Sequence, residues 1–174
     1  TVAALLADLR ADMENADDAF ERAVRLSIAG NIIDAGPGHD IDIEATIADV
    51  LEQPFAIDRL EELRADLQRA SDVLYLADNA GEIVLDRLLI EQIDADIEVV
   101  VKGQPFLNDV TREDIQDIDL PDAIDVRTRG EDGVGTITDE FERRLKDADV
   151  VISKGQGNYE LFSDVDATMY FLLM

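Results

Sequence analysis

Four short apolar runs in the second half of the chain constrain its fold more than any other feature. They cover residues 73–77, 97–101, 124–126 and 150–152, and helical patterns at 81–93, 111–116 and 136–146 separate them. Strands that alternate with helices indicate a parallel sheet joined by right-handed crossovers. Because the runs are mostly apolar, with Glu98 and Asp125 as their only polar residues, both faces of the sheet are expected to be covered. The pattern predicts an α/β fold of three α/β/α layers with a mostly parallel, doubly wound sheet.

Residues 1–70 are expected to form a helical N-terminal region, because apolar residues recur at helical spacing at 3–9, 18–28, 42–51 and 58–67. The glycines and proline of residues 30–38 predict a loop or break after the second helix. Residues 71–174 are expected to form an α/β metal-binding domain that packs with the first region as one unit. The chain starts without methionine and ends inside an apolar run, so we expect both ends to be cuts in a longer protein.

The chain is strongly acidic, with 41 Asp and Glu against 15 Lys and Arg and a net charge of -26. The acids are dispersed, and Lys102, Lys146 and Lys154 are the only lysines. At molar salt the Debye length is about 3 Å, so the self-repulsion of such a surface is largely screened. This favours a salt-adapted, cytoplasmic protein from a halophile, with an ordinary acidic protein as the alternative.

The same composition excludes several classes of function. No basic face is available to neutralise phosphates, so nucleic acid is not an expected partner. No apolar stretch of the sequence approaches the ~20 residues that cross a bilayer, so a membrane is not expected either. The sequence has no cysteine, which excludes disulfides, thiolate metal sites and cysteine nucleophiles within it. The oligomeric state cannot be predicted.

Polar residues stand where the apolar runs end. The first run is followed by Asp78 and Asn79, the second by Lys102 and the loop to Asp109, and the fourth by Lys154. The carboxyl ends of parallel strands meet at one edge of a sheet, and ligands bind there in open α/β folds. We therefore expect these residues to converge. The adjacent carboxylate and carboxamide after the first run are hard oxygen ligands suited to Mg²⁺ or Mn²⁺.

Each of these signals also has a purely structural interpretation. Residues 78–82 can form a turn with a capping carboxylate, and Asp109 can cap a helix that starts near Thr111. Lys154 precedes Gly155 and Gly157, which would let backbone amides approach a phosphate, but glycine-rich turns are common. The segment matches neither a P-loop nor a dinucleotide-binding fingerprint. We assign no role to His39, the only histidine.

Four blocks together resemble the motifs of one family. They are residues 30–34 (GNIID), 76–86 (LADNAGEIVLD), 101–103 with 107–111 (VKG and LNDVT), and 153–160 (SKGQGNYE). In this order they resemble the DUF89 family of metal-dependent damage-control phosphatases, in its archaeal stand-alone branch. Members of that family begin with a further helical segment and continue past the last strand expected here.

The resemblance implies a divalent ion, Mg²⁺, Mn²⁺, Co²⁺ or Ni²⁺, held by Asp78, Asn79 and Asp109. It also implies that Asn31, Glu82 and Lys154 face the phosphate of the substrate. The residues that we expect to be catalytic are Asp78, Glu82 and Lys154. Those that we expect to bind substrate are Asn31, Lys102, Asn108, Gly155 and Asn158. Lys154 is expected to reach into the crevice at the strand ends, where its charge would stabilise the reacting phosphoryl group.

The expected function is metal-dependent hydrolysis of a small phosphorylated metabolite, such as a sugar phosphate or a damaged phosphopantetheine derivative. An alternative route uses Asp78 as a nucleophile that forms an aspartyl-phosphate. Two other functions remain open: a non-catalytic module that binds a phosphometabolite, and a carboxyl methyltransferase acting on protein glutamates. Three acids near a phosphate are costly without a cation, which disfavours the binding module. No glycine-rich adenosine loop follows the first strand, which disfavours the methyltransferase.

Overall fold

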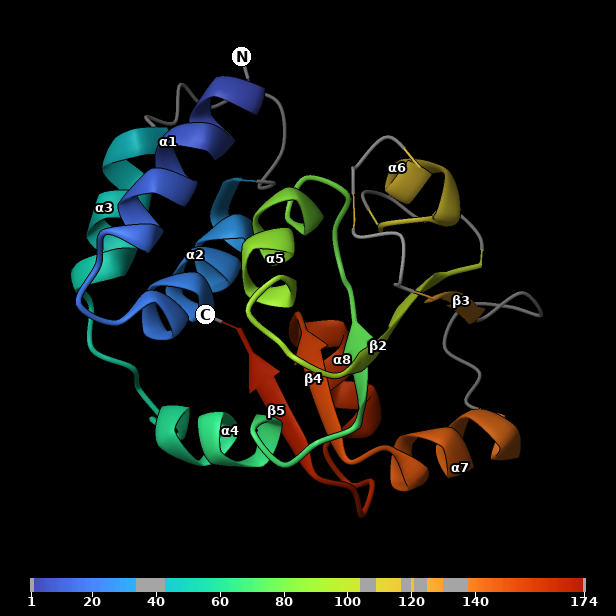
Figure 1. The fold of residues 1–174 in the computed structure, drawn as a ribbon. Helices are drawn as coiled ribbons and strands as arrows, with labels where there is room; N and C mark the ends of the chain where they lie inside the picture. Colours follow the sequence, from blue (N-terminus) through green and yellow to red (C-terminus); the bar gives the residue numbers. More distant parts are fainter. Residues whose placement is uncertain are drawn as a thin grey trace.

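A parallel sheet of five strands in the order β3-β2-β1-β4-β5 forms the centre of the computed structural model (Figure 1). The structure describes residues 2–33, 43–103, 109–116, 120, 125–129 and 138–173. The strands are β1 (Asp72–Leu76), β2 (Asp96–Lys102), β3 (Asp125–Arg129), β4 (Val150–Lys154) and β5 (Met169–Leu172). The first four contain or overlap the four predicted apolar runs, and the parallel pairing was expected.

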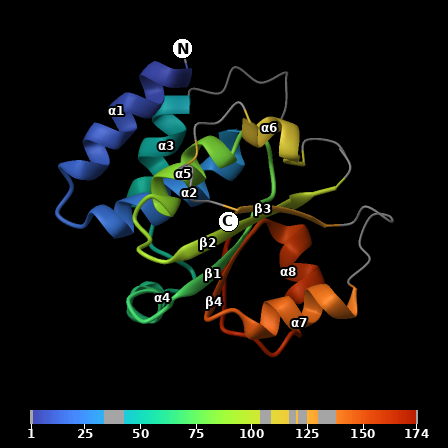
Figure 2. The ribbon, with the colours of Figure 1, turned by 45° about the vertical axis from the view of Figure 1, so that its right-hand side comes forward.

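Helices cover both faces of this sheet. They are α1 (Val2–Glu14), α2 (Ala19–Ile33), α3 (Ile43–Glu52), α4 (Leu60–Leu67), α5 (Ile83–Ile90), α6 (Arg112–Gln116), α7 (Asp139–Asp147) and α8 (Gln156–Phe162). Figures 1 and 2 show α1, α2, α3 and α5 on one side of the sheet and α7 and α8 on the other. The predicted three-layer α/β/α arrangement is therefore confirmed.

Alternate residues of β1 show how the two faces are built. Val73 and Tyr75 belong to the buried cluster that includes α1 to α5, and Leu74 and Leu76 belong to a second cluster with α7 and α8. All four are fully buried. Since successive side chains of a strand point to opposite faces, a strand covered on both sides is expected to be mainly apolar.

The N-terminal helices and the sheet share their largest buried cluster, which contains residues of α1 to α5 together with β1, β2 and β4. Helix α2 packs along α5, which makes α2 the neighbour of the loop that follows β1. The domain boundary at residue 70 stays a prediction. In the part of the chain that the structure describes, no helix is both long enough and apolar enough to span a membrane.

Three elements differ from the sequence-based expectation. Helix α2 continues through Gly30 to Ile33, where we expected a loop, and the rest of that expected loop, with His39, lies outside the described residues. Helix α8 and strand β5 were not predicted. A Cβ at Gly30 would lie 3.1 Å from the Cγ of Glu82, so this glycine lets two helices approach closely. Tertiary packing thus outweighs the low helix propensity of glycine here.

The connections place a potential ligand-binding edge at the middle of the sheet. The chain moves outward from β1 to β2 and β3, then returns to pair β4 with the other side of β1. The strand order therefore reverses between β1 and β4. In open α/β sheets, ligands bind beyond the carboxyl ends of the strands at such a reversal.

Candidate functional site

The loops after β1 and β2 are joined at the carboxyl edge of the sheet. The Val110 N–H donates to the carbonyl of Asp78 at 2.8 Å, and the Lys102 N–H donates to the carbonyl of Val110 at 3.1 Å. Asn79 and Asp109 form an isolated antiparallel bridge. The predicted convergence of these two strand ends is therefore confirmed, and Asp78, Asn79 and Asp109 lie side by side in the backbone framework.

The carboxylate of Asp109 lies beside a lysine. Its Oδ2 is 3.2 Å from Lys102 Nζ, and both side chains are partly exposed, by 15% and 22%. At the start of α6, the capping acid is Asp114. Its Oδ2 accepts hydrogen bonds from the N–H of Thr111 at 2.8 Å and from the hydroxyl of Thr111 at 2.7 Å. The structure thus gives Asp109 a place at the strand ends rather than the capping role considered for it.

Asp78 lies in a partly dehydrated position between charges of both signs. Burial raises the pKa of its carboxyl, Lys102 opposes that rise, and Asp109 adds to it. The backbone of Gly155 packs directly against this carboxylate, with φ at 79°, so that a Cβ at position 155 would overlap the carboxylate of Asp78. Asp78 is consequently held between the loops that follow β2 and β4.

The close approach of Gly155 leads to a stability prediction. Gly155→Ala should lower the free energy of unfolding by about 3 kcal/mol, because the substitution combines an unfavourable positive φ with overlap against Asp78. Gly157→Ala is the matched control, since its Cβ would meet nothing within 4 Å and alanine favours the helix there. Urea unfolding followed by circular dichroism compares the two. Equal stabilities would contradict the tight contact at Gly155.

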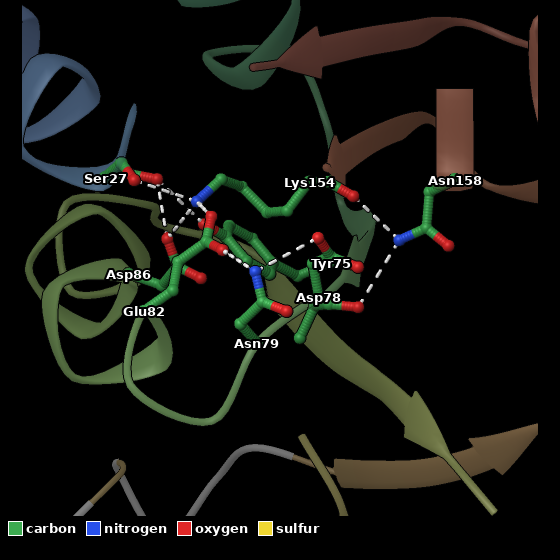
Figure 3. A network of polar contacts seen from close by, with 9 residues as sticks. Ser27, Tyr75, Asp78, Asn79, Glu82, Asp86, Lys154 and Asn158 are labelled. Carbon is green, nitrogen blue, oxygen red and sulfur yellow. Dashed lines mark hydrogen bonds and ion pairs between the residues drawn. The ribbon is translucent and has the colours of Figure 1, made fainter. Parts of the chain in front are cut away.

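A buried polar cluster lies behind these residues (Figure 3). The Lys154 ammonium forms ion pairs with Glu82 Oε1 and, at 2.7 Å, with Asp86 Oδ1, and it donates to the carbonyl of Ser27 at 2.9 Å. The Ser27 hydroxyl donates to Asp86 Oδ1 at 2.7 Å and lies 3.2 Å from the hydroxyl of Tyr75. Lys154 and Glu82 have fully buried side chains. The expected lysine in an open crevice is instead the last residue of β4, enclosed by acids.

The cluster contains two carboxylates and one ammonium in a dehydrated environment. Burial raises the pKa of Glu82 to about 7, the nearby charge of Lys154 opposes this, and Asp86 adds to it. Burial alone would lower the pKa of Lys154, but the carboxylates of Asp86 and Glu82 outweigh it and raise that pKa above its ordinary value. Lys154 therefore stays charged, and its charge is what makes two buried acids tolerable.

The other residues expected to bind substrate have varied positions. Asn31 is half-buried in the last turn of α2, and Asn108 lies outside the described residues. Asn158 is buried in α8 and donates to the carbonyls of Ala77, at 3.3 Å, and Lys154, at 2.8 Å. This carboxamide connects the ends of β1 and β4, so the structure gives it a bracing role.

Sequence reasoning missed Asp86 and Ser27 as members of the site. Asp86 lies four positions after Glu82 in α5, whose other residues are apolar except Arg87, so both acids project from the same side of the helix. A buried acid on an apolar helix face was the available signal. Ser27 gave no comparable signal, because a serine within a helix is compatible with any role.

The donor set at the strand ends fits a hard divalent cation. It provides two carboxylates and one carboxamide, and oxygen ligands of this kind suit Mg²⁺ and Mn²⁺. Burial and the proximity of Asp109 both disfavour the charged form of Asp78, and a cation would relieve this. Among the described residues no three His, Cys, Asp or Glu side chains gather as a metal-holding group, so a cation here would rely on the Asn79 carboxamide.

The sequence matches the damage-control phosphatase ARMT1-like domain over residues 1–174. The chain belongs to this family. The family resemblance and the fold expected from the four sequence blocks are thus confirmed.

Individual relatives of the ARMT1-like family agree with this assignment. A damage-control phosphatase of Pyrococcus horikoshii is 37% identical over 88% of this chain, and one of Archaeoglobus fulgidus is 35% identical over 87%. An uncharacterized protein of Methanocaldococcus jannaschii is 40% identical over 93%. The crystal structure of a DUF89 family protein from P. horikoshii superposes with a TM-score of 0.78 at 33% identity, covering 97% of this chain.

These relatives are longer than the present chain. It spans 57%, 56% and 59% of the P. horikoshii, A. fulgidus and M. jannaschii sequences and 63% of the crystallised chain.

Proposed function

We propose that this chain carries the active site of a metal-dependent phosphatase that acts on small phosphorylated metabolites. The observation that carries the proposal is the bridge between Asn79 and Asp109, since it joins the first metal-ligand loop to the second at the carboxyl edge of the sheet. Two relatives named damage-control phosphatases support the reaction class. The finer proposal is a substrate that is a sugar phosphate or a damaged phosphometabolite, such as a phosphopantetheine derivative.

In this proposal Asp78, Asn79 and Asp109 hold the divalent ion. When bound, the ion supplies Lewis-acid polarisation of the phosphoryl oxygens and a site for the attacking water. Without positive charge, a phosphate dianion would be repelled by two carboxylates at the mouth of the site. We therefore expect the carboxylates to bind a cation before the phosphate can bind, because the cation offsets their negative charge.

Among the side chains that the structure describes, Lys102 is the cation best placed to contact a phosphate oxygen. Its ammonium lies 3.2 Å from Asp109 and is partly exposed, so it can donate toward a ligand while it remains beside the carboxylate. Lys154, which the sequence also favoured for this task, has its hydrogen-bond donors engaged within the protein. We assign direct phosphate contact to Lys102 and keep Lys154 as a source of positive charge behind Glu82.

The test is a screen for release of inorganic phosphate from sugar phosphates and phosphopantetheine derivatives, with Mg²⁺, Mn²⁺, Co²⁺ and Ni²⁺ compared and a chelator as control. We expect turnover that the chelator abolishes and one of the metals restores. Tight binding of a phosphometabolite without turnover would support the binding module instead. Quenching during turnover, followed by borohydride reduction, separates the two routes, because an aspartyl-phosphate at Asp78 would be reduced to homoserine, whereas direct attack by water leaves Asp78 unchanged.

A further inference from the structure

The ammonium of Lys154 has no hydrogen left to offer a substrate. An ammonium has three N–H donors and no acceptor. In the structure these donate to Ser27 O at 2.9 Å, to Asp86 Oδ1 at 2.7 Å and to Glu82 Oε1. The side chain is fully buried. A phosphate could reach Lys154 only by displacing one of these partners, so the role of this lysine has to be sought in what it holds.

Lys154 holds one oxygen of Glu82, and the other oxygen faces the proposed metal ligands. Glu82 Oε2 accepts from Asn79 Nδ2 at 3.2 Å, and the same nitrogen donates to Asp78 Oδ2 at 3.3 Å (Figure 3). Both neighbours of that nitrogen are carboxylates, which only accept hydrogen bonds when ionised. The carboxamide of Asn79 is therefore oriented with its NH₂ group toward the two acids, which leaves its oxygen for another partner.

We propose that Lys154, Asp86 and Ser27 are positioning residues that fix Glu82, and that Glu82 in turn orients the Asn79 carboxamide so that its oxygen faces a divalent cation. The part of this inference that concerns the cation rests on the proposed function. A carboxamide can present either its oxygen or its nitrogen by rotation about one bond, and only the oxygen can ligate a hard cation. Groups that hydrogen-bond to a metal ligand commonly decide such orientations.

Helix α2 packs against the cluster of Lys154, Asp86 and Glu82 and fixes its position. Ser27 contributes its carbonyl to Lys154 and its hydroxyl to Asp86, and that hydroxyl also contacts Tyr75 of β1. One turn later, Gly30 allows the helix backbone to approach Glu82, whose Cα would lie 3.3 Å from a Cβ at that position. Glu82 is therefore confined by α2 on one side and by Lys154 on another, so that one oxygen is kept toward Asn79.

Glu82→Gln tests the orientation with almost no change of shape. Its oxygen would accept from Lys154, and its NH₂ group would then face the NH₂ group of Asn79. Asn79 relieves this clash by turning its oxygen toward Gln and its nitrogen toward the cation position. We expect the affinity for Mn²⁺, measured by calorimetry, to fall by about 10- to 100-fold, as for other substitutions behind a metal ligand. Glu142→Gln makes the same change in an exposed ion pair with Lys146 and should leave the affinity unchanged.

A double variant tests whether a hydrogen-bond donor and an acceptor can again be paired between positions 79 and 82. In the double variant Asn79→Asp with Glu82→Gln, the new aspartate accepts from the glutamine NH₂ group and still has an oxygen for the cation, and the total charge of the two positions is that of the wild type. We expect most of the lost Mn²⁺ affinity to return. Asn79→Asp alone measures how much a new carboxylate ligand adds to the Mn²⁺ affinity, and an orienting role of Glu82 requires that the effects of the two substitutions are not additive. Unchanged affinity in Glu82→Gln, or no recovery in the double variant, would overturn the proposal.

A readout without metal separates this inference from the proposed function. Nitrogen-15 NMR of the three lysine ammonium groups in the wild-type protein needs neither a variant nor a substrate. The Lys154 signal should exchange with water far more slowly than that of Lys146, whose side chain is 44% exposed. Rapid exchange at Lys154 would overturn the positioning role even if the protein is an active phosphatase. Slow exchange in a protein that binds no Mn²⁺ would uphold the Lys154–Glu82 contact while removing both the proposed function and the metal-facing role of Asn79.

Discussion

Asp109→Asn should reduce metal-dependent release of phosphate by roughly 10³-fold, because it removes one of the two carboxylates proposed to hold the ion. Lewis-acid stabilisation by a bound ion is worth several kcal/mol, and about 4 kcal/mol corresponds to a thousandfold change in rate. The folded state should be little affected, since Asp109 makes a partly exposed ion pair with Lys102, and such pairs contribute about 0–1 kcal/mol. Turnover with saturating Mn²⁺, metal affinity by calorimetry and a thermal melt give the three readouts.

Asp94→Asn provides the matched control for this substitution. Asp94 is exposed and lies just before β2, whereas Asp109 lies in the loop that follows the same strand, so the two substitutions change the same charge at opposite ends of the sheet. Activity and metal affinity should be those of the wild type in Asp94→Asn. A fully active Asp109→Asn protein with unchanged affinity would show that the second loop supplies no metal ligand, and the proposed site would fail.

The melting temperature should be higher by about 10 °C or more in roughly 2 M KCl than in 0.1 M KCl. For a chain of this size such a shift corresponds to about 3–5 kcal/mol at the melting temperature. The physical reason is the net charge of -26, whose self-repulsion destabilises the compact state and is screened within about 3 Å at molar salt. Ion pairs oppose this trend, because screening weakens them, but exposed pairs contribute little.

The ion pairs of Arg144 are partly buried, so salt should weaken them less than it weakens exposed ion pairs. Its guanidinium makes two hydrogen bonds to Asp72, at 2.7 and 2.8 Å, and one to Glu98 at 3.1 Å. Partly buried pairs are screened less than exposed ones, so this cross-strand contact should survive at high salt. A series with sucrose separates screening from surface exclusion, which also stabilises folded proteins. Equal melting temperatures at the two KCl concentrations would remove the salt-adaptation hypothesis.

The strands of the sheet could be predicted because their signal is local. Residues 73–77 and 150–152 are buried at every position, and residues 97–101 are buried except at Glu98, and this burial requires the largely apolar runs seen in the sequence. The positions of Asp78, Asn79 and Asp109 followed from topology, since parallel strands end at the same edge. Strand β5 was missed because its apolar residues lie at the end of the sequence with no helical pattern after them. Helix α8 was missed because Gly155 and Gly157 favoured a turn.

The environment of Lys154 could not be predicted, because it depends on partners that are distant in the sequence. A lysine followed by glycine has the same local pattern whether it faces a phosphate or is buried among acids. Of the decisive groups, Glu82 directly precedes α5, Asp86 lies within α5, and the carbonyl of Ser27 comes from α2. Only the packing of α2 along α5 brings the serine to the lysine.

The hydrogen bond between Ser27 and Lys154 spans 127 positions of the chain, which has a consequence for protein synthesis. The ribosome releases α2 long before β4, so a nascent chain contains Glu82 and Asp86 for many seconds before the ammonium that neutralises them exists. During that interval these two acids have to stay hydrated, and α5 cannot yet seal against the sheet. The loop that follows β1 therefore acquires its final shape only after the fourth strand has emerged.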